Sequence, residues 1–341
     1  MEMTGLSDNT AWKDTSVLIA GCGSIGKRHA RVLRFLGVKD IRICDIAEEQ
    51  RKSLMAEGPV TREFANYEDG LASQPDAVLI CTPPGMHIPM AIQAMENGSH
   101  ILREKPLSDS LDGVDRLSAV IERTGKVFMV AFCFRYHEGI KKAKAYLDEN
   151  RIGRLVSIRC RMGEHLPEAR PDYKNLFSLK KGGAFDLVHE IDLACWFAGQ
   201  PAAEVHSIHG AYSDLGFTAP DVAELVLRFG KKCVASVHLD FFSFPRTRLT
   251  ELMGTRGTIT VEFSSWDRCT VSVYEAEKGK WACEKMITER DSMFRSEDME
   301  FLRAITEGTP VGCPFSEAVK SLQIVCAAQS GINVTGNHNL S

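Results

Sequence analysis

The sequence lacks a long apolar run, a strong net charge and a secretory leader. No uninterrupted apolar stretch approaches the roughly 20 residues of a transmembrane helix, so we expect no membrane span. The formal net charge of −4 gives no general attraction to nucleic acid or to an anionic membrane. Residues 1–13 carry no cationic start followed by an apolar run, so we expect residues 1–14 to be a short flexible leader. These absences argue against membrane and nucleic-acid partners.

Cysteine pairs are also lacking. Eleven cysteines are scattered from Cys22 to Cys326 without a C-x-x-C motif, and most lie inside apolar runs, such as Cys44 in IRICDI. An odd number without clustering argues against a disulfide framework or a zinc site. We therefore expect no bound metal, and buried thiols that act as small apolar side chains. Because disulfides are rare in reducing compartments, a cytoplasmic location is the expectation.

Short apolar strands alternate with amphipathic helices from residue 16 to about residue 136. The expected strands are 16–21, 40–46, 77–84, 100–106 and 127–135, and the expected helices are 25–36, 47–57, 87–97 and 110–124. Parallel neighbours need crossover connections, so this alternation predicts an α/β domain with a parallel sheet. A chain of 341 residues is too long for one ordinary core, and we expect this domain to cover residues 15–136.

The pattern changes after residue 136. Strand-like runs are expected at 154–162, 203–212, 221–229, 232–242, 248–253, 257–263 and 269–275, and helices at 138–150, 186–198, 297–307 and 315–329. The segment FGKKC at 229–233 is typical of a hairpin connection. Strands joined by tight turns pair antiparallel, so we predict an α+β second domain over 137–335 with a mainly antiparallel sheet.

A glycine-rich loop joins the first expected strand to the first expected helix. It has the sequence Gly21-Cys22-Gly23-Ser24-Ile25-Gly26, and a second strand ending in Asp45 follows. Such a motif alone is weak evidence, but here the strand, the helix and the acidic residue all stand where a dinucleotide site needs them. The expected cofactor contacts in the loop are Gly21, Gly23, Ser24, Ile25 and Gly26. The alternative is a structural βα turn beside an ordinary surface aspartate.

Each part of this loop has a physical task in cofactor binding. Gly21 permits the tight turn, Gly23 lets the backbone approach the pyrophosphate, and Gly26 allows the helix to pack closely on the strand. The free N–H groups and the positive end of the helix dipole then meet the phosphates. Asp45 would accept hydrogen bonds from the adenosine ribose and repel a 2′-phosphate, which favours NAD. Arg42 and Arg51 lie close in sequence and leave NADP open.

The segment Arg103-Glu104-Lys105-Pro106 stands at the end of the expected strand at 100–106. Ligands on open α/β sheets bind beyond the carboxyl ends of the strands, so Lys105 should point into the cofactor crevice. A lysine there can donate a hydrogen bond to a substrate hydroxyl and relay the proton that is released as hydride leaves. The alternative is a solvated charge at a strand end.

Three stretches together resemble one family of oxidoreductases. They are GCGSIGKRHA at 21–30, the region from CTPPGMH at 81–87 to AIQAMENGSHILREKPL at 91–107, and GGAFDLVHEIDLACWFAG at 182–199. In this order they are similar to the Gfo/Idh/MocA family, which groups glucose–fructose oxidoreductase, inositol dehydrogenases and many sugar dehydrogenases. The resemblance implies a Rossmann domain followed by a large open, largely antiparallel sheet. A face of that sheet covers the nicotinamide and commonly serves as an oligomer interface, so a homodimer or homotetramer is expected.

The resemblance also implies roles for individual residues. It makes Lys105 catalytic and places Glu104 near the nicotinamide ribose. Thr82, Pro83 and His87 would line the cofactor site.

A second group of chemically active side chains follows the double glycine Gly182-Gly183. Asp186 and His189 are three residues apart, so they would share one face of the expected helix, with Asp192 further along. An imidazole beside a carboxylate suits a general base that takes a hydroxyl proton, and the glycines would let the backbone pass close to a sugar. The alternative is a helix start, with Asp186 as its cap and His189 packed against the sheet.

The family resemblance makes His189 the catalytic or substrate-orienting histidine. Two residues separate Asp186 from His189, whereas the commoner pattern of the family has three. The role of Asp186 is therefore less secure, and Asp192 could orient His189 instead.

Basic residues gather in the segment that leads to this group. They are Arg151, Arg154, Arg159, Arg161, Arg170, Lys174, Lys180 and Lys181. Some could meet an anionic group of the substrate, with Arg161 and His165 the preferred contacts, and Tyr136 and His137 could also touch it. The alternative is a solvated basic strand face and loop.

We therefore predict an NAD-dependent dehydrogenase that acts on a secondary alcohol of a sugar, sugar acid or cyclitol. His189 or Lys105 would remove the hydroxyl proton while hydride passes to the nicotinamide. One alternative is a redox-neutral elimination or epimerisation with tightly bound NAD. Another is a dinucleotide-binding sensor without catalysis, against which the presence of both Lys105 and His189 argues.

Overall fold

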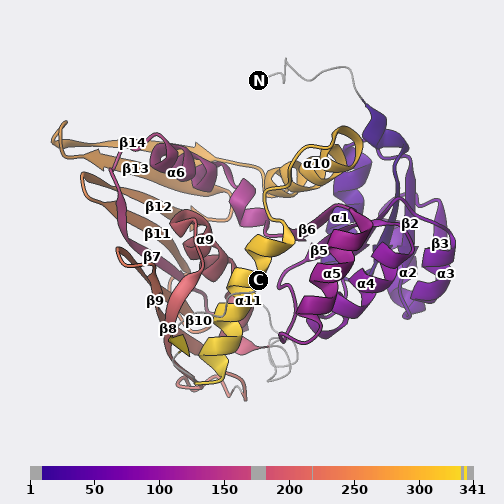
Figure 1. Ribbon diagram of the computed structural model, residues 1–341, viewed down its shortest axis with the longest axis horizontal. Coiled ribbons are helices and arrows are strands. Elements are labelled where there is room, and N and C mark those ends of the chain that lie inside the picture. Colours follow the sequence, from indigo (N-terminus) through magenta and orange to yellow (C-terminus); the bar gives the residue numbers. More distant parts are fainter. Residues whose placement is uncertain (1–9, 170–181, 217, 332–333, 336–341) are drawn as a thin grey trace. The chain divides into compact units, whose positions relative to one another are not determined.

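The computed structural model describes residues 10–169, 182–216, 218–331 and 334–335, and these residues divide into two compact units (Figure 1). The first unit draws its described residues from Met1–Leu107, Asp112–Ala131 and Phe294–Phe315. The second unit draws them from Ser108–Leu111, Phe132–Met293 and Ser316–Ser341. Each unit has its own sheet.

The first unit is built on a parallel sheet of six strands in the order β3-β2-β1-β4-β5-β6. The strands are β1 (Ser16–Ala20), β2 (Asp40–Cys44), β3 (Arg62–Phe64), β4 (Ala77–Ile80), β5 (His100–Glu104) and β6 (Phe128–Ala131). The helices are α1 (Ser24–Phe35), α2 (Glu48–Ala56), α3 (Tyr67–Ala72), α4 (His87–Glu96) and α5 (Val114–Thr124), together with most of α10 (Ser292–Glu307). The chain reverses its direction of travel across the sheet between β1 and β4, where doubly wound folds bind their ligands.

Burial on both faces explains why the central strands can be predicted from the sequence. All five residues of β1 and all four of β4 are buried. Helices cover both faces of a parallel sheet, so its strands consist of continuous apolar residues. The parallel α/β domain predicted from the sequence is confirmed.

The second unit carries a sheet of nine strands in the order β14-β13-β12-β11-β7-β10-β9-β8-β15. The strands are β7 (Leu155–Gly163), β8 (Ala202–Gly210), β9 (Val222–Phe229), β10 (Cys233–Asp240), β11 (Thr247–Gly254), β12 (Gly257–Ser265), β13 (Arg268–Glu275), β14 (Lys280–Ile287) and β15 (Val334–Thr335). Neighbours pair antiparallel except β7 and β10, which are parallel. The mainly antiparallel sheet and the hairpin at 229–233 are confirmed.

One face of this sheet is covered by helices of the same unit (Figure 1). The helices are α6 (Glu138–Asp148), α9 (His189–Ala198) and α11 (Phe315–Gln329). In β7 the side chains of Ile158, Cys160 and Met162 are buried, whereas Arg159 and Arg161 are exposed on the opposite face. This alternation is what a sheet covered on one side requires.

Several elements differ from the sequence-based expectation. Four elements were not expected from the sequence, namely β3, α3, β14 and β15, and no residue of β14 is buried. An edge strand without a buried face has no alternation of apolar residues to reveal it. Ala11–Asp14 form a 3-10 helix with Trp12 buried, so the described end of the expected leader is ordered. Phe294–Phe315, expected in the second domain, belong to the first unit.

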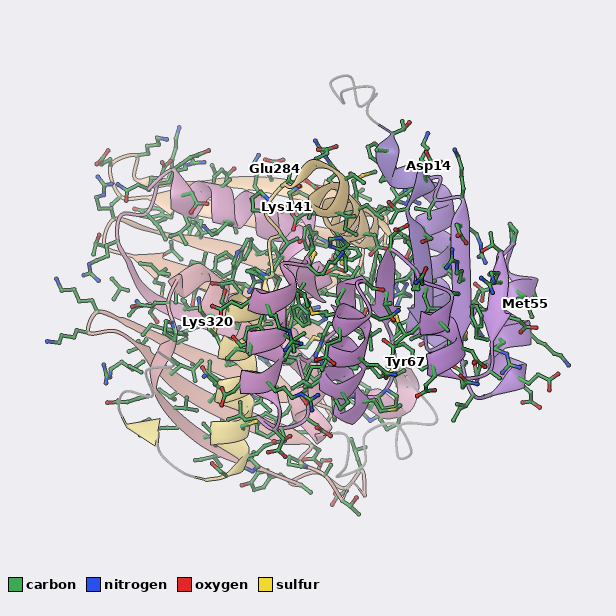
Figure 2. All side chains as sticks on the ribbon, turned by 45° about the vertical axis from the view of Figure 1, so that its right-hand side comes forward. Asp14, Met55, Tyr67, Lys141, Glu284 and Lys320 are labelled. Carbon is green, nitrogen blue, oxygen red and sulfur yellow. The ribbon has the colours of Figure 1, made fainter. Side chains whose placement is uncertain are left out.

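Charged side chains cover much of the exterior, for example Asp14 before β1 and Glu284 on β14 (Figure 2). All eleven cysteines are free thiols, and most of them are buried. Within the described parts of the chain, no helix is long and apolar enough to cross a bilayer.

Candidate active site

The glycine loop occupies the carboxyl end of β1, and two of its glycines are required by close contacts. Gly21 has a positive φ of 102°, and a Cβ atom there would lie 2.6 Å from the Cys81 carbonyl oxygen. A Cβ on Gly26 would lie 2.0 Å from the Gly21 carbonyl oxygen. A Cβ on Gly23, by contrast, would meet nothing within 4 Å. The open space above Gly23 is therefore available to a ligand that approaches the backbone.

Asp45 is bound to this loop. The Cys22 N–H donates to Asp45 Oδ2 at 2.8 Å, and the Ala47 N–H donates to Oδ1 at 2.8 Å. Each carboxylate oxygen keeps a second lone pair for a ribose hydroxyl. Helix α1 begins at Ser24, so its unpaired first-turn N–H groups face the same end of the sheet as the carboxylate. These groups fit a dinucleotide, with phosphate at the helix and ribose at Asp45.

Both arginines that left NADP open are engaged in other contacts. Arg42 donates to the Asp40 carboxylate, and its Nη1 donates to the Ser73 carbonyl oxygen at 2.7 Å. Arg51 forms an ion pair with Glu63 at 3.1 Å and donates to the Asp45 carbonyl oxygen at 2.7 Å. Neither guanidinium is held ready for a 2′-phosphate.

Lys105 follows β5 directly, and buried side chains hold the turn that carries it. Arg103 is fully buried and donates to the carbonyl oxygens of Pro106 and Leu107. Burial lowers the pKa of its guanidinium to about 9. Glu104 Oε2 accepts the Lys105 backbone N–H at 3.1 Å, and the bond from Lys105 to Pro106 is cis. The side chains of Arg103 and Glu104 thus hold the backbone of the turn, at Lys105 itself and at the two residues after it.

His87 does not line an open cofactor surface, contrary to the expectation. It is 1% exposed, with Nε2 2.7 Å from the Thr82 carbonyl oxygen and Nδ1 3.0 Å from that of Pro106. Burial and the nearby Arg103 charge lower the pKa of its imidazole to about 3, so the ring is neutral. A neutral imidazole has one N–H, so His87 donates to one of these two carbonyl oxygens and packs between the loop after β4 and the turn after β5. Thr82 is half-buried and Pro83 is exposed, so these two are open to a ligand.

Glu104, expected near the nicotinamide ribose, is engaged inside the first unit. Its Oε1 lies 3.1 Å from His29 Nε2, while Oε2 holds the Lys105 N–H. His29 Nδ1 in turn lies 2.9 Å from Asp298 Oδ1 on α10. Glu104 therefore stands between a buried histidine and the backbone of Lys105.

In the second unit, Asp186 and His189 do not share one α-helix as expected. Asp186 lies in a 3-10 turn over Gly183–Leu187, and His189 is the first residue of α9. Gly182 and Gly183 both have positive φ, and a Cβ on Gly183 would lie 2.3 Å from the Pro220 carbonyl oxygen. Packing against Pro220 is thus sufficient reason for a glycine at 183.

The His189 ring packs against two aromatic side chains. The centroid of its ring lies 5.2 Å from that of Phe134 and 5.8 Å from that of Phe132. His189 is half-buried, so part of the imidazole remains accessible. Aromatic packing of this kind fixes the orientation of the imidazole without a charge.

The carboxylates that follow His189 on α9 are buried in ion pairs. Asp192 is 1% exposed and accepts two hydrogen bonds from Arg135, at 2.8 and 2.7 Å. Glu190 pairs with Arg248 at 2.6 Å, and both are buried. The expectation that Asp192 contacts substrate or orients His189 is therefore replaced by a structural role.

The other residues expected to contact the substrate lie on separate elements of the second unit. Arg161 lies on the exposed face of β7, opposite the face covered by α9, so it is not beside His189. Tyr136 is buried in a 3-10 helix. His165 is half-buried, with its ring centroid 3.8 Å from that of Phe244. The expected cations Arg170, Lys174, Lys180 and Lys181 lie outside the described residues.

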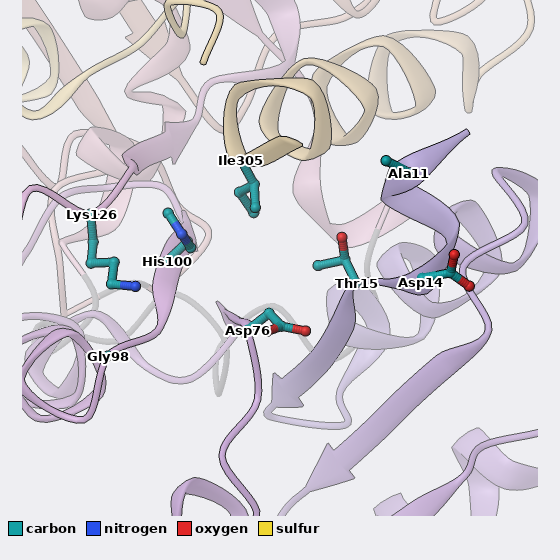
Figure 3. A pocket seen from close by; sticks show the side chains of 8 residues that line it. All are labelled: Ala11, Asp14, Thr15, Asp76, Gly98, His100, Lys126 and Ile305. Carbon is teal, nitrogen blue, oxygen red and sulfur yellow. The ribbon is translucent and has the colours of Figure 1, made fainter. Parts of the chain in front are cut away.

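A separate cavity of about 290 Å³ lies in the first unit at the amino ends of the strands (Figure 3). Thr15 precedes β1, Asp76 precedes β4 and His100 begins β5. In a parallel sheet these ends are opposite the carboxyl ends that carry the glycine loop and Lys105. The cavity is therefore distinct from the candidate active site.

Comparisons with known proteins agree with this geometry. A family model described as "Oxidoreductase family, NAD-binding Rossmann fold" matches residues 15–132, and one for the "GFO/IDH/MocA C-terminal domain" matches residues 140–260. The chain belongs to the Gfo/Idh/MocA family. It is therefore an NAD-binding oxidoreductase, as the resemblance predicted.

Named relatives of the Gfo/Idh/MocA family match over nearly the whole chain. An uncharacterized oxidoreductase, YrbE, of Bacillus subtilis is 26% identical, covering 92% of this chain and 93% of its own length. Myo-inositol 2-dehydrogenase of Thermotoga maritima is 22% identical, covering 92% and 95%. The fold matches a solved levoglucosan dehydrogenase in complex with NADH, with a TM-score of 0.83, 22% identity and coverage of 95% and 100%.

The residues that hold the turn of Lys105 were not predicted from the sequence. Arg103 carries a signal, because a charge inside a buried strand needs a partner. His29 and Asp298 carry none, because their partnership joins α1 to a helix 269 residues further along the chain.

Proposed function

We propose that this protein is an NAD-dependent dehydrogenase that oxidises a secondary alcohol of a sugar, sugar acid or cyclitol. The observation that carries the proposal is the position of Lys105. It follows β5 at the same sheet edge as the glycine loop, on a turn held by Arg103 and Glu104. Relatives named for inositol and levoglucosan support a polyhydroxylated substrate.

Lys105 in the first unit and His189 in the second unit are the two candidates for the proton chemistry. NAD, when bound, supplies the acceptor for the hydride. The Lys105 ammonium donates a hydrogen bond to the substrate hydroxyl, which lowers the pKa of that hydroxyl. His189, whose ring packs against Phe132 and Phe134, is the other candidate for the base that takes the proton. Asp186, on the 3-10 turn before it, is a further candidate.

The preference for NAD over NADP rests on Asp45. Its carboxylate would accept ribose hydroxyls and repel a 2′-phosphate. The engagement of Arg42 with Asp40 and of Arg51 with Glu63 supports the same choice.

Exposed apolar residues on one face of the second unit's sheet support a homo-oligomer. Ile208, Val226 and Val234 are 69%, 55% and 46% exposed, on the adjacent strands β8, β9 and β10. Apolar residues exposed together on one sheet face are typical of an interface. A strictly monomeric mass by light scattering at micromolar concentration would refute this part. A cytoplasmic location remains a prediction that rests on the free thiols.

The proposal is tested with a panel of sugars, sugar acids and inositols, offered with NAD or NADP. Wild-type protein should form reduced nicotinamide with at least one of them, faster with NAD. Lys105→Met should lower kcat by about 10²–10⁴-fold. NADH affinity, measured by fluorescence, should stay close to the wild-type value. A fully active Lys105→Met variant would overturn the assignment, and turnover without accumulated NADH would indicate the redox-neutral reaction.

A further inference from the structure

His29 lies among the carboxyl groups of Asp298, Glu297 and Glu104, and Glu104 is the residue before Lys105. Its Nδ1 is 2.9 and 3.0 Å from the two Asp298 oxygens, and its Nε2 is 3.1 Å from Glu104 Oε1. The side chains of His29 and Asp298 are 1% exposed, and that of Glu104 is 12% exposed. The third carboxyl, Glu297 on α10, is fully buried, and neither of its oxygens has a hydrogen-bond partner among the described residues.

Both ring nitrogens of His29 face carboxyl oxygens, so each contact needs a proton to be a hydrogen bond. A neutral imidazole has one N–H, so its other nitrogen would turn a lone pair toward a carboxylate oxygen. Both contacts are hydrogen bonds only when two protons are shared by the ring and the two carboxyl groups. An imidazolium between two carboxylates satisfies this condition, with charge-assisted bonds on both sides.

The surrounding charges favour the imidazolium. Burial opposes the charged form of His29, but Asp298 and Glu104 outweigh it and raise the pKa of the ring well above its usual value. Burial and the neighbouring carboxylates Glu104 and Asp298 raise the pKa of Glu297 well above its usual value. Burial also raises the pKa of Asp298, although the His29 charge beside it opposes this rise. Glu300 adds to the rise in the pKa of Glu297. Burial and Glu104 raise the pKa of the Cys81 thiol after β4, so that thiol stays neutral.

A continuous path leads from this histidine to the backbone of Lys105. Glu104 Oε1 binds His29, and Glu104 Oε2 accepts the Lys105 N–H at 3.1 Å. The path joins α10, α1 and the end of β5 within the first unit. Without the imidazolium, the Glu104 carboxylate would lose its buried counter-charge, and a protonated or displaced Glu104 would be a weaker acceptor.

We propose that His29 and Asp298 are positioning residues for Lys105. Asp298 holds the His29 imidazolium, the imidazolium holds the Glu104 carboxylate, and the carboxylate fixes the backbone that carries the lysine. The proposal rests on the proposed function, in which Lys105 binds the substrate hydroxyl. Displacement of a reacting group by about 1 Å can cost a hundredfold in rate, which is why such support matters.

The test compares Asp298→Asn and His29→Gln with a matched control, His100→Gln. His100 lies at the opposite end of the same strand β5, where its Nδ1 accepts the Val127 N–H at 3.0 Å. Both network variants should lose about 10–100-fold in kcat, with the KM for substrate and the affinity for NADH changed less than about threefold. The double variant should be no worse than either single one, because the residues act in one path. The control should keep wild-type kcat.

Thermal unfolding of each variant separates a folding defect from a positioning defect, because kcat is compared only below the transition. Two further measurements need no substrate. The ¹⁵N resonances of His29 should report an imidazolium at neutral pH, and hydrogen exchange of the Lys105 amide should accelerate at least about tenfold in Asp298→Asn. A neutral His29 or unchanged exchange would overturn the proposal, as would folded network variants with wild-type kcat. If the wild-type protein oxidises no substrate, the proposed function fails, and these two measurements still decide the network.

Discussion

Replacing Asp192 with asparagine should destabilise the protein without touching its chemistry. Asp192 and Arg135 are 1% and 3% exposed, and the carboxylate accepts hydrogen bonds from Nε and Nη2 of the guanidinium. Removing one partner of a buried pair costs about 3–5 kcal/mol, because the other charge stays buried. Glu317 lies 3.7 Å from the guanidinium and is 28% exposed, so it compensates in part. We therefore expect a loss near the lower limit, about 3 kcal/mol.

The assay is urea unfolding followed by fluorescence, with thermal unfolding beside it. A loss of about 3 kcal/mol corresponds to a fall in melting temperature of roughly 6–12 °C for a domain of this size. Glu251→Gln is the control, because it breaks an exposed pair with Arg159 of 3.4 Å and should cost less than about 1 kcal/mol. The double variant Arg135→Met with Asp192→Leu should recover much of the loss, since no charge is left buried.

One pattern of results would contradict the role of Asp192 as a buried counter-ion. If Asp192→Asn unfolds at the wild-type urea concentration while the KM for substrate rises, the carboxylate is a substrate ligand and not a buried counter-ion. The expected pattern is the reverse, with lower stability and an unchanged KM below the transition.

Two further predictions concern the cofactor half. Gly26→Ala should abolish measurable NADH binding, because its Cβ would lie 2.0 Å from the Gly21 carbonyl oxygen and the loop must open; calorimetry showing wild-type affinity would contradict this. The buried neutral His87 should make the protein less stable in acid. Its pKa is about 3 when folded and about 6.5 when unfolded, so between these values only the unfolded chain gains the proton, and stability falls as pH falls. Urea unfolding at pH 7, 6 and 5 should show a smaller decline for His87→Gln than for wild type.

Whether a strand could be predicted from the sequence depended on how many of its faces are buried. Strands β1 and β4 are buried on both faces, so their sequences are continuous apolar runs that any reader can find. Strand β14 is exposed along nearly its whole length, and β3 has only three residues, so neither leaves a pattern. The expected strands also extended past their ends at Cys44, Ile80 and Glu104, because apolar or β-prone residues continue into the functional loops.

The residues of the candidate site also differ in how far the sequence predicts their surroundings. The glycine loop, Asp45, Lys105 and His189 were proposed from local order along the chain, and their roles stay predictions. His87 was misplaced because a motif does not say which side of a loop a side chain takes. Asp192 was misplaced because helical spacing from His189 takes no account of Arg135, which lies 57 residues away in sequence.

The sequence by itself determined the order of the buried strands and the long helices, the loop at 21–26 and the type of residue that follows β5. Those features depend on local burial patterns and on backbone clearance, as for Gly21 and Gly26. Only the tertiary structure decided that Glu104 rests on His29 and Asp298, that Asp192 is a counter-ion, and that Phe294–Phe315 pack in the first unit. Such partnerships arise when distant segments bury their charges together, and a buried charge takes whichever partner the fold brings to it.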